Sequence, residues 1–165
     1  YYDIQYSLIA TDMQMNSSGG RGFLMNTSGE IIGVITKKTT PSDVSVYTAI
    51  GISELKNLIE RLSNGEKEVY IGVKAEEITD TVSRRTDMPK GMLVKEVQND
   101  GPAMLAGILP MDIITEIDGN PITGYASYRA WLRNAGAGET VKVKALRSGK
   151  EGYEEAVFEV TVGER

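Results

Sequence analysis

Residues 101–122 read GPAMLAGILPMDIITEIDGNPI, and this stretch decides the fold of the second half of the chain. Pro102 follows a glycine and takes the first position of a short helix, where the missing N–H of proline costs nothing, and Gly107 ends that helix. The run 112–117 then predicts a strand, and the pair Asp118-Gly119 is typical of a tight turn.

Strand and helix patterns continue on both sides of this stretch. An apolar run precedes a polar segment, 74–90, to which the pattern assigns no element. The predicted elements around 101–122 are strands at 70–73, 91–97, 141–147 and 156–162 and a helix at 125–134. Two short helices among about five strands describe a small α+β domain.

The first half of the chain predicts a sheet followed by one helix. Apolar, β-prone runs lie at 6–10, 23–26, 31–36 and 44–50, and they are separated by loops at 13–22 and 37–43. Leu55, Leu58, Ile59 and Leu62 recur with the helical period, and Ser53 is a candidate N-cap. The charged residues that follow place a linker at 65–68, between domains at 1–64 and 69–165.

Composition excludes several functional classes. The chain has 165 residues, a net charge of −5 and neither cysteine nor histidine. An acidic chain is a poor partner for nucleic acid, and a chain without histidine has no Ser-His-Asp triad of its own. We therefore expect no metal and no cofactor. The opening residues are no signal peptide, which predicts that the chain is a piece of a longer protein.

The second half resembles the PDZ domain of the HtrA proteases over residues 69–163. Four segments match in order: 70–73 (YIGV) resembles the carboxylate-binding loop, 101–108 resembles "SPAxxAGL", 110–114 resembles "PGDII" and 117–122 resembles "INGxPV". Met111 departs from this pattern, because it stands where a turn glycine is usual, so the turn is expected to differ locally.

The resemblance implies a site for the free end of a peptide. A carboxylate needs convergent N–H donors, and a glycine lets the backbone come close to it. The predicted peptide-binding residues are Tyr70, Ile71, Gly72, Val73, Tyr128, Trp131 and Leu132. The alternative to peptide binding is that these side chains simply pack in the core. The core role is preferred for Tyr128 and Leu132, and the two roles are equally open for Trp131.

The first sixty residues resemble the end of the trypsin-like domain of the same family. Residues 11–34 match "TDAxINPGNSGGxLxNxxGExIGI" at both ends. Without gaps, Gly20 takes the place of the nucleophile, so no catalytic residue is expected; a shifted register instead places Ser18 there. The ungapped register is preferred, and a third possibility is that this is an ordinary Ser/Gly loop. The implied fold is mainly β with short helices: a partial trypsin-like antiparallel barrel followed by a PDZ domain.

The expected function is therefore a peptide-binding PDZ module attached to a degenerate protease domain, inactive as this chain. One alternative is a fragment of an active serine endopeptidase whose PDZ domain recruits or senses substrate, and another is a scaffold module. Expected partners are extended peptides or protein C-termini, and either a second copy or an upstream half that completes the barrel. The resemblance implies protein quality control in the bacterial cell envelope, outside the cytoplasm, with an N-terminal membrane tether.

Overall fold

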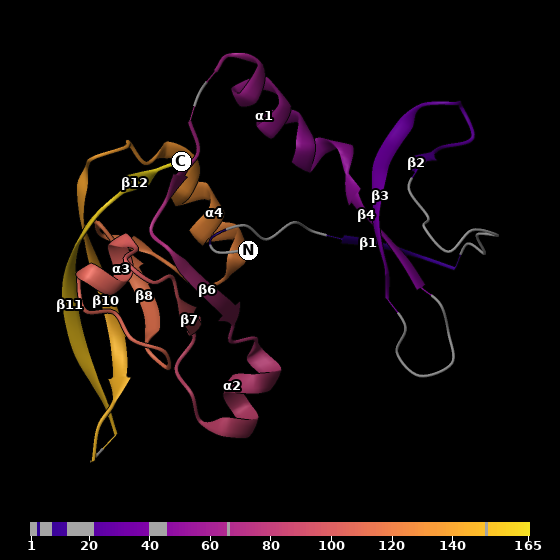
Figure 1. The fold of residues 1–165 in the computed structure, drawn as a ribbon. Coiled ribbons are helices and arrows are strands. Elements are labelled where there is room, and N and C mark those ends of the chain that lie inside the picture. Colours follow the sequence, from indigo (N-terminus) through magenta and orange to yellow (C-terminus); the bar gives the residue numbers. More distant parts are fainter. Residues whose placement is uncertain (1–2, 4–7, 13–21, 40–45, 66, 151) are drawn as a thin grey trace. The chain divides into compact units, whose positions relative to one another are not determined.

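The structure is a computed structural model that describes residues 3, 8–12, 22–39, 46–65, 67–150 and 152–165. It divides the chain into two compact units, one of residues 1–5 with 67–165 and the other of residues 6–66 (Figure 1). Ser18 and Gly20, the two candidates for the nucleophile position, lie outside the described residues. Among the described residues, no helix is long and apolar enough to cross a membrane.

The unit of residues 6–66 is an open antiparallel sheet with one helix. Its elements are β1 (Leu8–Thr11), β2 (Gly22–Met25), β3 (Ile31–Thr39), β4 (Val46–Gly51) and α1 (Ile52–Ser63). The strand order is β1-β4-β3-β2, and Ile35, Tyr47 and Ala49 form a small core. Phe23 and Met25 stay 63% and 56% exposed. The fold of this unit is therefore mainly β, as predicted. Its described strands form an open sheet that does not close into a barrel.

The unit of residues 1–5 and 67–165 is built on a larger antiparallel sheet. Its strands are β5 (Val69–Tyr70), β6 (Val73–Glu77), β7 (Met92–Val97), β8 (Ile113–Ile117), β9 (Asn120–Pro121), β10 (Thr140–Ser148), β11 (Tyr153–Thr161) and β12 (Gly163–Glu164). Its helices are α2 (Asp80–Thr86), α3 (Pro102–Leu105) and α4 (Tyr125–Asn134). The sheet order is β11-β10-β8-β7-β6, with β9 beside β8, so β6 lies at one edge (Figure 1).

One apolar core holds this unit together. Its fully buried side chains include Val94, Ile114, Ile117, Val143 and Val160 from the sheet and Ile71 from the loop between β5 and β6. Helix α3 adds Ala103 and α4 adds Tyr128 to the same cluster. Burying a valine or isoleucine side chain of the sheet contributes about 1.5–3 kcal/mol.

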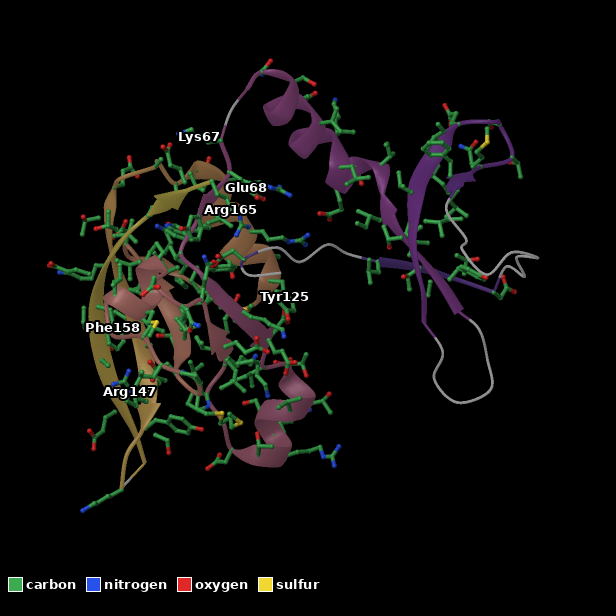
Figure 2. The ribbon with its side chains drawn as sticks, in the orientation of Figure 1. Lys67, Glu68, Tyr125, Arg147, Phe158 and Arg165 are labelled. Carbon is green, nitrogen blue, oxygen red and sulfur yellow. The ribbon has the colours of Figure 1, made fainter. Side chains whose placement is uncertain are left out.

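The two ends of this unit are tied to each other. Strands β5 and β12 pair, and Glu68 and Arg165 exchange two main-chain hydrogen bonds of 3.0 and 2.9 Å. Figure 2 shows their side chains side by side, and Arg165 Nε donates to a Glu68 carboxylate oxygen at 3.2 Å. The last residues of the chain therefore fix the strand that leads into the loop at 71–73.

Three local predictions are wrong. Strand β3 continues to Thr39, because the residues after 36 pair with β4, so residues 37–39 are not part of the loop predicted at 37–43. Ser53 lies inside α1 rather than at its cap. The polar segment 74–90 contains strand β6 and helix α2; α2 buries none of its side chains, so no apolar period marked it in the sequence.

The turn at Met111 keeps a glycine-like backbone, contrary to the expected local difference. Met111 has φ of 75°, in the left-handed region, and its side chain is 57% exposed. The next residue, Asp112, is buried and accepts hydrogen bonds from the Leu109 amide at 2.9 Å and from Arg147 Nε and Nη2 at 2.7 Å each. Arg147 in turn lies over the Phe158 ring, 5.3 Å from its centre (Figure 2). These contacts hold the turn in spite of the strain.

We expect Met111→Gly to raise the free energy of unfolding by about 1 kcal/mol, because glycine adopts the left-handed region without the Cβ clash. Met111→Ala is the matched control, since it removes the same exposed side chain but keeps the Cβ. Urea unfolding of both variants measures the difference. Equal midpoints for the glycine and alanine variants would show that the strain is absent.

Candidate carboxylate-binding site

The loop between β5 and β6 has the geometry that places backbone N–H groups at a surface. Gly72 has φ of 85°, and a Cβ added there would lie 3.2 Å from the Cβ of Gln98. A glycine is therefore favoured at this position, both for its left-handed backbone and for the close approach of Gln98.

Two hydrogen bonds from other segments fix the direction of the loop's N–H groups. The Ile71 carbonyl accepts from the Ala103 amide at 2.8 Å, and the Gly72 carbonyl accepts from the Gln98 amide at 2.8 Å. In a trans peptide the N–H points opposite to the C=O of the same planar group. Since both carbonyls face inward, the N–H groups of Gly72 and Val73 face outward.

These N–H groups hold a carboxylate that the sequence did not point to, that of Asp3. Gly72 N donates to Asp3 Oδ2 at 2.7 Å, and Val73 N lies 3.4 Å from Asp3 Oδ1. The Tyr128 hydroxyl, from α4, donates to the same Oδ1 at 2.5 Å. The Asp3 amide donates to the Val73 carbonyl at 2.8 Å. The site thus binds a carboxylate with three donors and pairs with the main chain beside it.

Burial governs the electrostatics of this site. Only 7% of Asp3 is exposed, and burial raises the pKa of its carboxyl, although hydrogen bonds from Tyr128, Gly72 and Val73 and the charge of Arg165 oppose this rise. Burial, with the charge of Asp3 next to it, also raises the pKa of Tyr128 well above 10. Tyr128 therefore keeps its proton and remains a donor at physiological pH.

Helix α4 forms the opposite wall of the site and is attached to β6 by polar contacts. The first amide of α4, that of Tyr125, donates to a Glu77 carboxylate oxygen at 2.9 Å, a favourable place for a negative charge. The Tyr125 hydroxyl donates to the Ala75 carbonyl at 3.0 Å. Tyr125, labelled in Figure 2, and Tyr128 also line a small pocket beside Asp3 with a volume of about 10 Å³, which is at the lower limit for holding one water molecule.

The structure brings together only some of the predicted site residues. Gly72, Val73 and Tyr128 meet at the Asp3 carboxylate. Ile71 is fully buried and contributes its carbonyl to the loop's support. Tyr70 lies under Arg165, whose guanidinium carbon is 5.1 Å from the centre of the Tyr70 ring. Trp131 and Leu132 are half-buried and pack against the core. The peptide-binding role of all seven residues stays a prediction.

The architecture is that of a small domain with an antiparallel sheet and short helices, in the same chain as a second, mainly β unit. Comparison with known proteins agrees, since the PDZ-domain family matches residues 69–156, more than half of the chain. The chain belongs to the PDZ-domain family and is a homologue of the HtrA-type serine proteases.

Two curated relatives show this homology. The chain is 34% identical over 158 residues to the serine protease Do-like HtrA of Bacillus subtilis (strain 168), which covers 88% of this chain and 35% of that protein. It is 31% identical over 150 residues to the periplasmic pH-dependent serine endoprotease DegQ of Escherichia coli (strain K12), which covers 87% and 33%. The chain thus spans about a third of the length of these relatives.

Solved structures give the same picture of the fold. The HtrA-type protease AlgW with a decapeptide matches at a TM-score of 0.63 and 26% identity, over 97% of this chain and 50% of that one. The serine endoprotease from Yersinia pestis matches at 0.58 and 28%, over 96% and 52%. The HtrA3 PDZ domain bound to a phage-derived ligand (FGRWV) matches at 0.51 and 19%, over 61% and 89%, which shows the fold alone.

We expect the pKa of Asp3 to exceed that of an aspartate in an unstructured peptide, as measured by the pH dependence of its carboxyl ¹³C resonance. Tyr128→Phe removes a hydrogen bond that lowers this pKa and should raise it further. Tyr125→Phe is the matched control, since that hydroxyl bonds Ala75 instead. Because the bound carboxyl has the raised pKa, its docking is most favourable below the ordinary pKa of aspartate and weakens as pH rises through the raised value. An Asp3 pKa at or below the ordinary one would contradict this.

Proposed function

We propose that residues 69–165 form a module that binds the free carboxyl end of an extended peptide. The observation that carries the proposal is the hydrogen bonding of a carboxylate by Gly72 N, Val73 N and the Tyr128 hydroxyl. A terminal carboxylate presents the same two oxygens to the same donors. The bonds to it are charge-assisted and therefore among the stronger ones available to a protein.

The rest of the peptide would extend along β6. Within the described sheet, β6 has β7 as its only strand neighbour, so its other edge lies toward α4. A peptide that adds a strand there pairs through its main chain and inserts alternate side chains into pockets. In this proposal Ile71 supports the loop, and Tyr70, Trp131 and Leu132 border the groove. Since Trp131 and Leu132 already pack against the core, their part is to shape the groove wall.

For the first half we propose a protease-like domain at 1–64, joined by a linker at 65–68, that is inactive within this chain. The chain contains no histidine, and a serine without a neighbouring base is a poor nucleophile. The open sheet with exposed Phe23 and Met25 supports completion by another segment or by a second copy. Periplasmic relatives support a place outside the cytoplasm, and a membrane tether upstream is part of the same proposal.

A second candidate function is that the chain belongs to an active serine endopeptidase, with Ser18 as nucleophile and the PDZ domain recruiting or sensing substrate. The observation in its favour is that the curated relatives are serine proteases. The two candidate functions differ in which residue stands at the family's nucleophile position. In the endopeptidase it is Ser18, and in the inactive domain it is Gly20.

A C-terminal peptide library should bind the full chain at least about 10-fold more tightly with free carboxyl ends than with amidated ends, because amidation replaces one acceptor oxygen by an NH2 group, which cannot accept a hydrogen bond from Gly72 N or Val73 N. Gly72→Ala should weaken binding by a similar factor. Gly119→Ala is the matched control, since Gly119 also has a positive φ, of 76°, but no atom lies within 4 Å of its added Cβ. Fluorescence anisotropy measures each affinity. Equal binding of free and amidated peptides would refute the proposal.

Labelling with a fluorophosphonate probe separates the two candidate functions. The inactive-domain proposal predicts no labelling of the wild-type chain or of the longer protein that contains it. Labelling of the longer protein that disappears in Ser18→Ala would establish the endopeptidase instead. Ser17→Ala is the matched control for a neighbouring serine.

A further inference from the structure

Asp3 imitates the last residue of a bound peptide. Its amide donates to the Val73 carbonyl at 2.8 Å, while its carboxylate accepts from Gly72 N at 2.7 Å. A peptide's terminal residue would present an amide and a carboxylate to the same two places. The difference is that the carboxylate of Asp3 is on its side chain, one carbon further from the main chain, so the chain can continue beyond it.

We propose that this site takes the side-chain carboxylate of an internal aspartate as well as a terminal carboxylate, and that Asp3 is such a ligand in cis, which a peptide must displace. The inference rests on the proposed function for its second half, since displacement requires a peptide that binds. Its first half, recognition of an internal aspartate, stands on the contacts of Asp3 alone.

The backbone of Asp3 supports recognition of aspartate in particular. Asp3 has φ of 60°, a left-handed conformation that Asp and Asn adopt more readily than most other residues. This conformation turns the main chain at the point where its side chain enters the site. A glutamate would need the same turn with a longer side chain, so aspartate is the residue that fits both requirements.

Satisfaction of the polar groups argues that the contact is a true binding arrangement. No buried side-chain nitrogen or oxygen among the described residues lacks a hydrogen-bond partner. Without Asp3, the Tyr128 hydroxyl and the Gly72 amide would need a new acceptor, since an unpaired buried donor costs about 1–3 kcal/mol. The site is therefore built for a carboxylate, whichever molecule supplies it.

Competition in cis lowers the apparent affinity for any peptide. A ligand in the same chain competes with a peptide as an intramolecular partner, and a site that is free in only a fraction of the molecules binds a peptide more weakly by that fraction. If Asp3 occupies the site in about nine molecules of ten, a peptide binds about 10-fold more weakly than to a chain without Asp3.

The test uses the full chain as wild type, as Asp3→Asn and as Asp12→Asn, an exposed aspartate that serves as the matched control. The probe is a dye-labelled peptide of residues 1–8, YYDIQYSL, with an amidated end, and its partner YYNIQYSL has Asn in place of Asp. Fluorescence anisotropy measures binding of both, and the Gly72 amide resonance reports occupancy of the site without any peptide.

We expect Asp3→Asn to shift the Gly72 amide resonance upfield and to bind YYDIQYSL about 10-fold more tightly than wild type does, with no such gain for YYNIQYSL or for Asp12→Asn. An unmoved Gly72 resonance, or equal affinities of wild type and Asp3→Asn, would overturn the inference. If free-carboxyl peptides bind Asp3→Asn but YYDIQYSL does not, the inference fails and the proposed function stands. If YYDIQYSL binds and no free-carboxyl peptide does, recognition of internal aspartate stands and the proposed function fails.

Discussion

The orientation of the peptide group between Ile71 and Gly72 is the constraint on which the carboxylate site depends. The Ala103 amide, at the start of α3, holds the Ile71 carbonyl, so the Gly72 N–H must point the other way, toward Asp3. The glycine-proline helix start that decides the fold thus also aims the principal donor of the site. A domain with the same sheet but without α3 would lose this direction.

Three parts of the domain, two of them adjacent in sequence, contribute to the binding of one carboxylate. The loop gives two N–H groups, α4 gives the Tyr128 hydroxyl, and Glu77 and Ala75 at β6 fix the start of α4 through Tyr125. Removing a carboxylate from water is costly, and the raised pKa of Asp3 reflects this cost. The hydrogen-bond donors offset this desolvation cost only while all three parts keep their positions. The short loop therefore depends on the structure around it.

The sequence predicted the elements whose patterns are local, and it missed the contacts that join distant residues. The α4 helix has the predicted bounds, 125–134, whereas the strand predicted at 70–73 is interrupted at 71–72, where Gly72 has a positive φ. Helix α2 escaped prediction because it buries no side chain. Asp3 escaped because nothing near it in sequence marks an acid that meets Gly72, 69 residues further on. Trp131 and Leu132 share a helix with Tyr128, but a helical period cannot tell a groove wall from a core.

Exchange of one carboxylate for another decides what kind of peptide can use this site. A terminal carboxylate that replaces Asp3 gains the same three donors and loses the same water, so these two terms nearly cancel. The net affinity then comes from what Asp3 does not supply, namely strand pairing along β6 and side chains in the groove beside α4. The Tyr125 hydroxyl already bonds the Ala75 carbonyl, so pairing beyond Val73 must compete with that contact as well. A peptide therefore outcompetes Asp3 through the residues before its carboxylate, since the carboxylate itself only replaces the hydrogen bonds that Asp3 already makes.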